Sequence, residues 1–315
     1  MYQKLEYMKI AILNKYQEST NRGAETFVRE LSKRLQKNHQ VDVISKVDYF
    51  KLLNSKYNLI IPTNGRFQSF ATRIITWITG AKMVISGQSG VGFDDRLNLY
   101  SMPNAFVALS SYALKQSGKR NPYVKVVYIP NGVDLSRFVV KSKTNDHKQL
   151  TVLSVGAFTE QKRHELVIEA VSKLKDVNLI IAGGGGDKKL DLKILGENLL
   201  GKDRFEIIET TNDKMPEIYS RANVFTLASK TYESFGIVLV EAMASGLPVV
   251  ATDDPIRREI VGDAGLFVDP TDTDAYAAAI ERVLNTDWGN KPRKQAEKFD
   301  WDVIAKQYED LFNTL

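Results

Sequence analysis

Two carboxylates with different surroundings stand out in the stretch TYESFGIVLVEAMASGLPVVAT, residues 231–252. Glu233 lies in a polar turn, whereas Glu241 lies inside an apolar run. A buried carboxylate is costly unless hydrogen bonds or an ion pair satisfy it. It can also accept hydrogen bonds from two vicinal hydroxyls, which sugar rings and riboses present. The two acids therefore either cap the helix and pair with a nearby Lys or Arg, or await a hydroxyl-bearing ligand.

The residues around these acids predict a helix that begins just after Glu233. A polar turn at 234–236 leads into IVLVEAMA (237–244), and Ser245-Gly246 ends the run. The free N–H groups at the start of such a helix can bind anionic or carbonyl oxygens. The pattern predicts a mixed site of backbone donors and a carboxylate acceptor.

The elements that must position this site alternate between apolar runs and amphipathic helices. Continuous Val/Ile/Leu runs are typical of strands that are covered on both faces. Twelve runs are predicted to be strands: 9–13, 40–45, 58–63, 82–87, 105–110, 124–130, 150–156, 178–183, 205–209, 223–229, 248–252 and 265–269. Helices are predicted between them, as at 23–37 and 164–175. This alternation in both halves predicts two doubly wound α/β domains.

Breaks in the pattern divide the chain. Pro130-Asn131-Gly132 interrupts regular structure and a polar segment follows, which places the linker at about 131–149. We expect a first domain at 1–135, a second at 150–300, and a helix at 301–315 that packs back on the first. We expect residues 1–7 to be an extension outside the fold.

Composition narrows the class of protein. The 315 residues are 43% hydrophobic and 26% charged, as in soluble globular proteins. There is no cysteine, which excludes disulfides and thiolate metal sites. No apolar run reaches the roughly 20 residues of a transmembrane helix, and the N-terminus lacks the apolar core of a secretory leader. These features favour a cytoplasmic protein.

The charge is unevenly distributed. Residues 1–150 hold 23 Lys and Arg against 10 Asp and Glu, a net charge of +13, whereas residues 151–315 carry a net charge of −8. One interpretation is an ordinary solvated surface. The other is a first half that meets an anionic surface or substrate.

Several motifs together resemble retaining glycosyltransferases of family 4, the group 1 glycosyl transferases. The E-x7-E region of that family resembles ESFGIVLVEAMASGLPVVAT, and the segment that follows it resembles GDAGLFVDPTD (262–272). The opening of the family's donor domain resembles SVGAFTEQKRHELVIEAVSKL (154–174), and its hinge between domains resembles IPNGVDLSRF (129–138). The first glycine loop and helix resemble NRGAETFVREL (21–31), and the closing helix resembles FDWDVIAKQYEDLF (299–312). The matches follow the family's order over nearly the whole chain.

The resemblance implies a GT-B fold, with two Rossmann-like domains that face each other across a cleft. It implies transfer of a hexose-type sugar, with retention, from a nucleotide-diphosphate sugar to a glycan, lipid-linked or other glycoconjugate acceptor. Such an enzyme must stabilise charge on the departing diphosphate. It needs no metal or other cofactor, because protein cations and backbone donors can supply that charge. With the basic first half, a peripheral contact with an anionic membrane is expected, and nucleic acid is not an expected partner.

The resemblance also assigns roles to particular residues. Lys162 and Arg163 would stabilise the diphosphate as catalytic cations, where the alternative is a solvated basic pair. Glu233 would bind the hydroxyls of the donor sugar as the third catalytic residue. The donor-binding residues implied are Gly23 and Arg22 near the phosphates, Gly183 and Met215 near the nucleotide, Ser234, Phe235 and Gly236 beside Glu233, and Glu241 at the ribose.

Two positions depart from the family pattern. Ala157 stands where many members have an arginine, a charge that Arg163 would replace, and Gln88 with Ser89 stands where many have a histidine. Other classes of protein stay open. A two-domain sugar receptor would have a similar architecture, and a degenerate transferase would bind nucleotide sugar without turnover. A Rossmann dehydrogenase is disfavoured because no G-x-G-x-x-G follows the first strand of either half.

Overall fold

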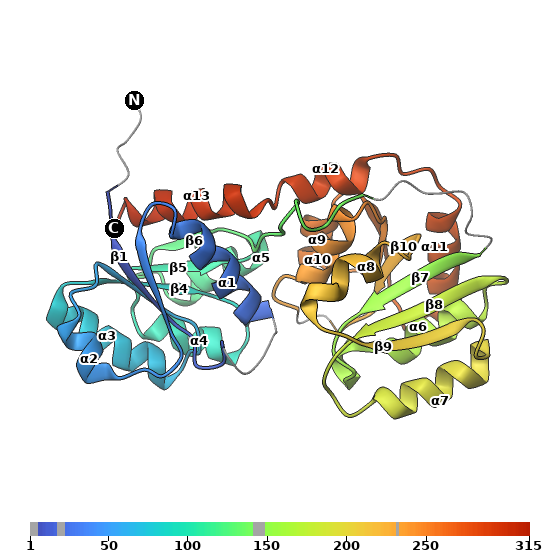
Figure 1. Cartoon of the computed structure of the whole chain (residues 1–315), viewed down its shortest axis with the longest axis horizontal. Coiled ribbons are helices and arrows are strands. Elements are labelled where there is room, and N and C mark those ends of the chain that lie inside the picture. Colours follow the sequence, from blue (N-terminus) through green and yellow to red (C-terminus); the bar gives the residue numbers. More distant parts are fainter. Residues whose placement is uncertain (1–5, 18–22, 141–148, 231–232) are drawn as a thin grey trace. The chain divides into compact units, whose positions relative to one another are not determined.

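The computed structural model describes residues 6–17, 23–140, 149–230 and 233–315. The chain forms two compact units. Unit 1 consists of Met1–Gly132 with Asp300–Leu315, and unit 2 consists of Val133–Phe299. In each unit a parallel sheet is covered by helices on both faces (Figure 1). The segment at 141–148, expected to belong to the linker, lies outside the described residues.

Within the described residues, unit 1 has a six-stranded parallel sheet in the order β2-β1-β3-β4-β5-β6. Its strands are β1 (Lys9–Leu13), β2 (Gln40–Ile44), β3 (Leu59–Pro62), β4 (Lys82–Ser86), β5 (Ala105–Ala108) and β6 (Val126–Tyr128). The strand order changes direction between β1 and β3. Such a switch point is where open α/β sheets bind ligands, outside the carboxyl ends of the strands.

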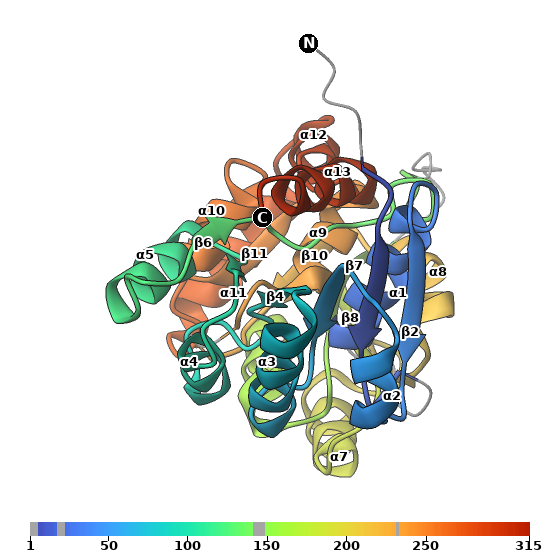
Figure 2. The same cartoon turned by 90° about the vertical axis from the view of Figure 1, so that its left-hand side faces the viewer.

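Alternate residues of the unit 1 strands face two different helix layers. The helices are α1 (Gly23–Leu35), α2 (Tyr49–Asn54), α3 (Phe67–Thr79), α4 (Phe93–Tyr100), α5 (Ser111–Arg120) and α13 (Trp301–Phe312). Ile10 and Ile12 of β1 pack in a core with α1 and α13. Ala11 and Leu13 pack in a second core with α2 and α3, which lie next to each other in both views (Figures 1 and 2). The closing helix α13 thus completes unit 1.

The described part of unit 2 also has a six-stranded parallel sheet, in the order β12-β11-β10-β7-β8-β9. Its strands are β7 (Leu150–Val155), β8 (Val177–Gly183), β9 (Phe205–Glu209), β10 (Val224–Leu227), β11 (Val249–Thr252) and β12 (Gly265–Val268). The first and fourth strands of this unit, β7 and β10, are neighbours at its centre. They flank the switch point of a Rossmann-type sheet.

The helices of unit 2 cover both faces of this sheet. They are α6 (His164–Ser172), α7 (Lys189–Leu200), α8 (Met215–Tyr219), α9 (Ile237–Ala244), α10 (Pro255–Val261), α11 (Thr273–Leu284) and α12 (Lys291–Glu297), with short 3-10 turns η1 (Glu160–Lys162) and η2 (Asn212–Lys214). A core of β7, β8, α6 and α11 side chains lies on one face, where Val152, Val167, Leu179 and Ile280 are buried.

The twelve predicted strands coincide with β1–β12 to within two residues at each end. The prediction of two doubly wound α/β domains is confirmed by the two parallel sheets. The apolar runs predicted the strands well because many of these strands are covered on both faces. The four residues of β3 and the four of β10, for example, are all buried. Among the described residues, no helix combines the length and the apolar character that crossing a membrane requires.

Candidate functional site

An ion pair lies at the switch point of unit 2. Lys162 ends η1, in the loop that follows β7, and Glu233 lies in the loop that follows β10. The ammonium of Lys162 donates a hydrogen bond to Oε1 of Glu233. The Lys162 and Glu233 side chains are 23% and 19% exposed, so a ligand can reach both. The structure thus brings together two of the three residues that the sequence assigned to catalysis.

The stem of Lys162 is held against a glycine turn. A Cβ at Gly156 would lie 3.1 Å from both Cγ and Cδ of Lys162, so the side chain runs directly over that residue. The chain then turns sharply at Arg163, whose φ of 49° lies in the left-handed region. A lysine at this point can therefore extend from the carboxyl edge of β7 towards β10.

Arg163 contacts the backbone of the neighbouring loop. Its Nε donates to the carbonyl of Ala228 at 2.7 Å, and its Nη2 donates to the carbonyl of Ser229 at 3.2 Å. These bonds anchor the residues that connect β10 to Glu233. Arg163 therefore lies beside the ion pair and supports the Glu233 loop.

Sequence reasoning missed a second arginine at this site. Arg257 of α10 is fully buried, pairs with Asp254, and donates to Oγ of Ser229 at 2.7 Å and to the Ser229 carbonyl at 3.1 Å. Asp254 caps α10 by accepting from the Ile256 and Arg257 amides, both at 2.9 Å. The Asp-Pro start of α10 was a visible signal for the cap. Nothing in the sequence showed that Arg257 points inward.

These cations set the charge state of Glu233. Burial raises the pKa of the Glu233 carboxyl, but Lys162, Arg257 and a hydrogen bond from Ser229 outweigh burial and leave the pKa below its ordinary value. Burial lowers the pKa of the Arg257 guanidinium to about 10, although the negative charge of Glu233 opposes that change. At neutral pH the site therefore holds a carboxylate and cations, which suits a ligand with both hydroxyls and an anionic group.

The buried Glu241 of α9 is satisfied by a tyrosine. It is 5% exposed, and its Oε2 accepts from the Tyr219 hydroxyl of α8 at 2.9 Å. Burial and the Glu241 carboxylate raise the pKa of Tyr219 well above its ordinary value, so the phenol stays a donor. Met215, at the start of the same α8, is buried. A phenol is therefore one partner of this carboxylate, and the pairing with a Lys or Arg stays a prediction.

The turn before α9 combines a buried ring with a left-handed glycine. Phe235 is buried and its ring meets Phe299 edge-on, with centroids 5.7 Å apart. Gly236 has a φ of 84° and caps α9, while Ser234 is partly exposed. Because the ring of Phe235 is buried, this residue can contact a ligand only through its backbone.

Gly183, at the end of β8, lies against the glycine turn under Lys162. A Cβ at Gly183 would lie 2.0 Å from the carbonyl oxygen of Gly156, closer than any real contact. The glycine is therefore needed so that the backbones after β7 and β8 can approach each other.

The unit 1 residues form a separate group. Gly23 is exposed and opens α1, and Arg22 lies outside the described residues. Gln88 exchanges two hydrogen bonds with Asn131, at 3.0 and 3.2 Å, and donates to Oγ of Ser86 at 2.8 Å. Ser89 beside it is exposed. Gln88 therefore holds its loop against the segment that leaves unit 1.

Of the described histidines, neither is exposed. His164 is fully buried with Nδ1 3.1 Å from Oγ of Ser154, and burial, with the charge of Lys162, lowers its pKa to about 4. His39 is buried near Glu309. The described residues contain no group of three or more His, Cys, Asp or Glu that could hold a metal ion.

The two sheets, with a reachable Lys–Glu pair at the Rossmann switch point of unit 2, define a GT-B protein. Residues 137–299 match the family model of glycosyl transferases group 1. The match spans more than half of the chain, which therefore belongs to this family.

Known proteins resemble the chain in sequence and in fold. It is 32% identical over 203 residues to a phosphatidyl-myo-inositol mannosyltransferase of Mycolicibacterium smegmatis, covering 60% of this chain and 52% of that protein. The chain thus spans about half the length of the curated relatives it matches. HepE of Anabaena, in a crystal structure with UDP, superposes with a TM-score of 0.83 at 18% identity over 98% of this chain and all of that one. The galactosyltransferase WaaB superposes with a TM-score of 0.77 at 16% identity over 98% and 100% of the two chains. At these identities the two structures show the fold.

Proposed function

We propose that the protein is a retaining glycosyltransferase that moves a hexose from a nucleotide-diphosphate sugar to a glycan, lipid-linked or other glycoconjugate acceptor. The observation that carries the proposal is the Lys162–Glu233 pair at the carboxyl ends of β7 and β10. A switch point is where a Rossmann-type sheet binds a nucleotide. A cation beside a carboxylate matches a ligand that joins a diphosphate to a ring of hydroxyls.

In the proposed reaction, the bond between the anomeric carbon and the diphosphate oxygen breaks and the sugar gains positive character. Lys162 stabilises the charge on the departing diphosphate. Glu233 accepts hydrogen bonds from the sugar hydroxyls, and its negative charge stabilises the cationic sugar. The acceptor hydroxyl attacks the face that the diphosphate leaves, and its proton passes to the leaving phosphate oxygen.

The other contacts with the donor are proposed as the family resemblance implies. Glu241 holds the ribose, with the amides of residues 234–236 beside the sugar, and Gly183 and Met215 border the nucleotide. The resemblance also predicts phosphate contacts for Gly23 and Arg22. The cations of the chain itself supply the charge that other transferases take from a metal, so the reaction is metal-independent.

Relatives and charge point to the acceptor class. Relatives of the chain include a phosphatidyl-myo-inositol mannosyltransferase and an O-antigen chain mannosyltransferase of Escherichia coli, and HepE was solved with UDP. With the +13 charge of residues 1–150, these names favour an acceptor in a cell-surface glycan or on an anionic membrane. The protein would work in the cytoplasm, in peripheral contact with that membrane.

The proposal is tested first with a panel of nucleotide sugars in a thermal-shift assay. A donor at 100 times its dissociation constant stabilises a protein by about 2.7 kcal/mol. With the donor that shifts the melting temperature, Glu233→Gln should lower kcat/KM for transfer or donor hydrolysis by about 100-fold or more. The reason is that glutamine keeps the size of the side chain but removes its charge.

Glu206→Gln is the matched control, because Glu206 is an exposed acid of β9 that pairs with Arg221. It should transfer sugar like the wild type. A Glu233→Gln variant with wild-type activity would overturn the proposed role. NMR of the product should show the anomeric configuration of the donor, and activity should persist in excess EDTA.

A further inference from the structure

Helix α3 is amphipathic, but its polar side is buried and its apolar side is exposed. Its buried face consists mostly of polar side chains, namely Gln68, Ser69, Thr72 and Thr76, with Ile75. Its outward face carries Phe67, Phe70, Ile74, Trp77 and Ile78, whose exposed fractions run from 41% to 75%. The spacing of these five residues is that of one helix face. A continuous apolar stripe of this kind marks an interaction surface rather than a solvated one.

The adjacent helix α2 extends this surface. Phe50 of α2 is 77% exposed. The two helices meet through Tyr49 and Phe67, whose rings pack edge-on with centroids 6.2 Å apart. Figures 1 and 2 show α2 and α3 side by side in unit 1. We call Phe50 with the five outward residues of α3 the α2–α3 face.

The charges on and near this face are basic. Helix α3 contains no acidic residue, and the guanidinium of Arg73 lies over the Trp77 ring, 5.0 Å from its centroid. Trp and Phe beside Arg and Lys are the composition of helices that lie in a membrane interface.

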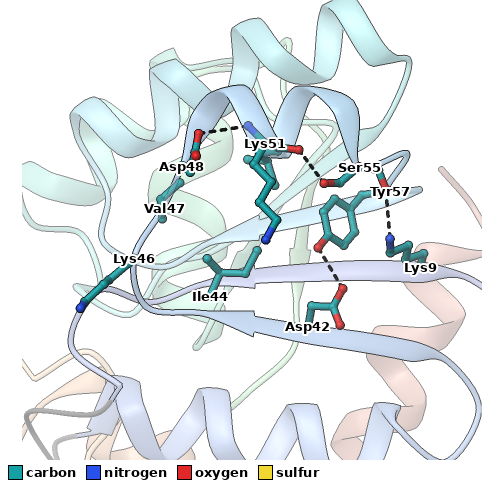
Figure 3. A pocket seen from close by; sticks show the side chains of 10 residues that line it. Lys9, Asp42, Ile44, Lys46, Val47, Asp48, Lys51, Ser55 and Tyr57 are labelled. Atoms are coloured by element: carbon teal, nitrogen blue, oxygen red, sulfur yellow. Dashed lines mark hydrogen bonds between the residues drawn. The ribbon is translucent and has the colours of Figure 1, made fainter.

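A pocket of about 380 Å³ between α2 and β2 adds lysines (Figure 3). Its two carboxylates have partners within the protein: Asp42 accepts from the Tyr57 hydroxyl at 2.9 Å, and Asp48 caps α2. Lys46 and Lys51 line the same pocket, and neither makes an ion pair within the described part of the chain. Figure 3 shows Lys51 extending from α2 towards β2, with Lys46 directed outward. Two cations are therefore available to an anionic group.

We propose that the α2–α3 face docks unit 1 on a membrane surface rich in anionic lipid, with Lys46 and Lys51 contacting lipid phosphates. Helix α3 follows β3, so its first turn lies at the carboxyl edge of the unit 1 sheet. Docking there brings a lipid-linked acceptor to the edge where open α/β sheets bind ligands. The inference deepens the proposed function, from which it takes the lipid-linked acceptor and the peripheral contact with an anionic membrane.

The test is co-sedimentation with phosphatidylcholine vesicles, with and without phosphatidylglycerol. The wild type should bind the anionic vesicles at least about tenfold more strongly, and added salt should weaken binding. Of the three tryptophans, Trp301 is buried and Trp288 half-buried, whereas Trp77 is exposed. Anionic vesicles should therefore shift the emission of Trp77 to the blue.

A triple variant, Ile74→Gln, Trp77→Gln and Ile78→Gln, should lose vesicle binding by about tenfold or more while the thermal melt is unchanged, since glutamine is a good helix former. Lys46→Gln with Lys51→Gln should reduce the preference for anionic vesicles several-fold. Tyr123→Gln is the matched control, because Tyr123 is an aromatic residue of unit 1 that is 86% exposed outside this face. It should bind like the wild type.

Two results would overturn the inference. One is a triple variant that binds anionic vesicles as the wild type does. The other is a wild type that sediments as a dimer, binds no vesicles and becomes monomeric in the triple variant, which would make the face a contact between two copies. Donor hydrolysis by the triple variant is measured in parallel without lipid. Hydrolysis that persists while vesicle binding is lost separates the docking surface from the proposed chemistry.

Discussion

At the scale of single residues, the charge state of Glu233 decides what this site can do. Lys162 and Arg257 outweigh burial and hold the pKa of Glu233 below its ordinary value. Such a carboxylate is a weak base, so it serves through its charge and its accepting oxygens. That fits the proposed contact with sugar hydroxyls better than a role in removing a proton from the acceptor.

Asp95 of α4 is a second residue with an unusual charge state. It is 2% exposed, and burial raises the pKa of its carboxyl from 3.8 to about 8. Its Oδ1 accepts from Asn98, and within the described residues Oδ2 has no hydrogen-bond partner. Between about pH 4 and 8 the folded chain therefore holds a proton that the unfolded chain has released.

Asp95 should accordingly make the protein less stable as pH rises through that window. Asp95→Asn keeps the neutral shape, so it should raise the free energy of unfolding by at least about 1 kcal/mol at pH 8 and less at pH 5. Urea unfolding at both pH values measures this effect. Asp310→Asn is the control, since Asp310 is exposed, pairs with Lys306 and is not among the groups that shift the pKa of Asp95. A gain that is equal at the two pH values would contradict the explanation.

At the scale of elements, the loops after β7 and β8 are held in place by a close contact between two glycine backbones. Gly183 lies so close to Gly156 that any side chain would strike its carbonyl, and Lys162 lies over Gly156. The position of Lys162 therefore depends on the packing of two neighbouring strand ends.

Gly183→Ala should displace this turn, lower the free energy of unfolding by about 1–3 kcal/mol and weaken donor binding. Gly184→Ala is a close control, because its Cβ would meet only the Thr210 carbonyl at an ordinary 3.5 Å. Calorimetry and donor titration of both variants measure the two effects. Equal stability of the two variants would show that the close approach is relieved without cost.

At the scale of the whole molecule, unit 1 is built from both ends of the chain. Trp301 of α13 is buried, its ring lies 6.1 Å from that of Phe27, and it covers Gly132, where a Cβ would lie 2.6 Å from the indole. The last helix therefore belongs to the core of unit 1, although the whole of unit 2 precedes it in the chain.

Trp301→Ala should lower the stability of unit 1 by about 3–5 kcal/mol, because it leaves a large cavity in that core. Val303→Ala on the same helix should have little effect, since Val303 is exposed. Calorimetry should show the change in the unit 1 transition, and the proposed binding of nucleotide by unit 2 should persist, because Trp301 belongs to the core of unit 1. Loss of nucleotide binding in a folded Trp301→Ala protein would contradict the expectation that the effect is confined to unit 1.

Local patterns in the sequence determined much of this architecture. The twelve apolar runs predicted the twelve strands, and the run at 237–244 predicted α9, because burial on both faces and helix-ending residues leave local signals. The resemblance to a known family singled out Lys162 and Glu233, which are far apart in the chain.

Only the tertiary structure decided how these residues meet. It paired Lys162 with Glu233, turned Arg163 to the carbonyls of Ala228 and Ser229, and buried Arg257 beside them. It also turned the apolar side of α3 outward, although the apolar side of an amphipathic helix usually faces the core. The spacing of apolar residues predicts that a helix has an apolar and a polar face. Which of the two faces is covered depends on the neighbouring elements that the fold brings together.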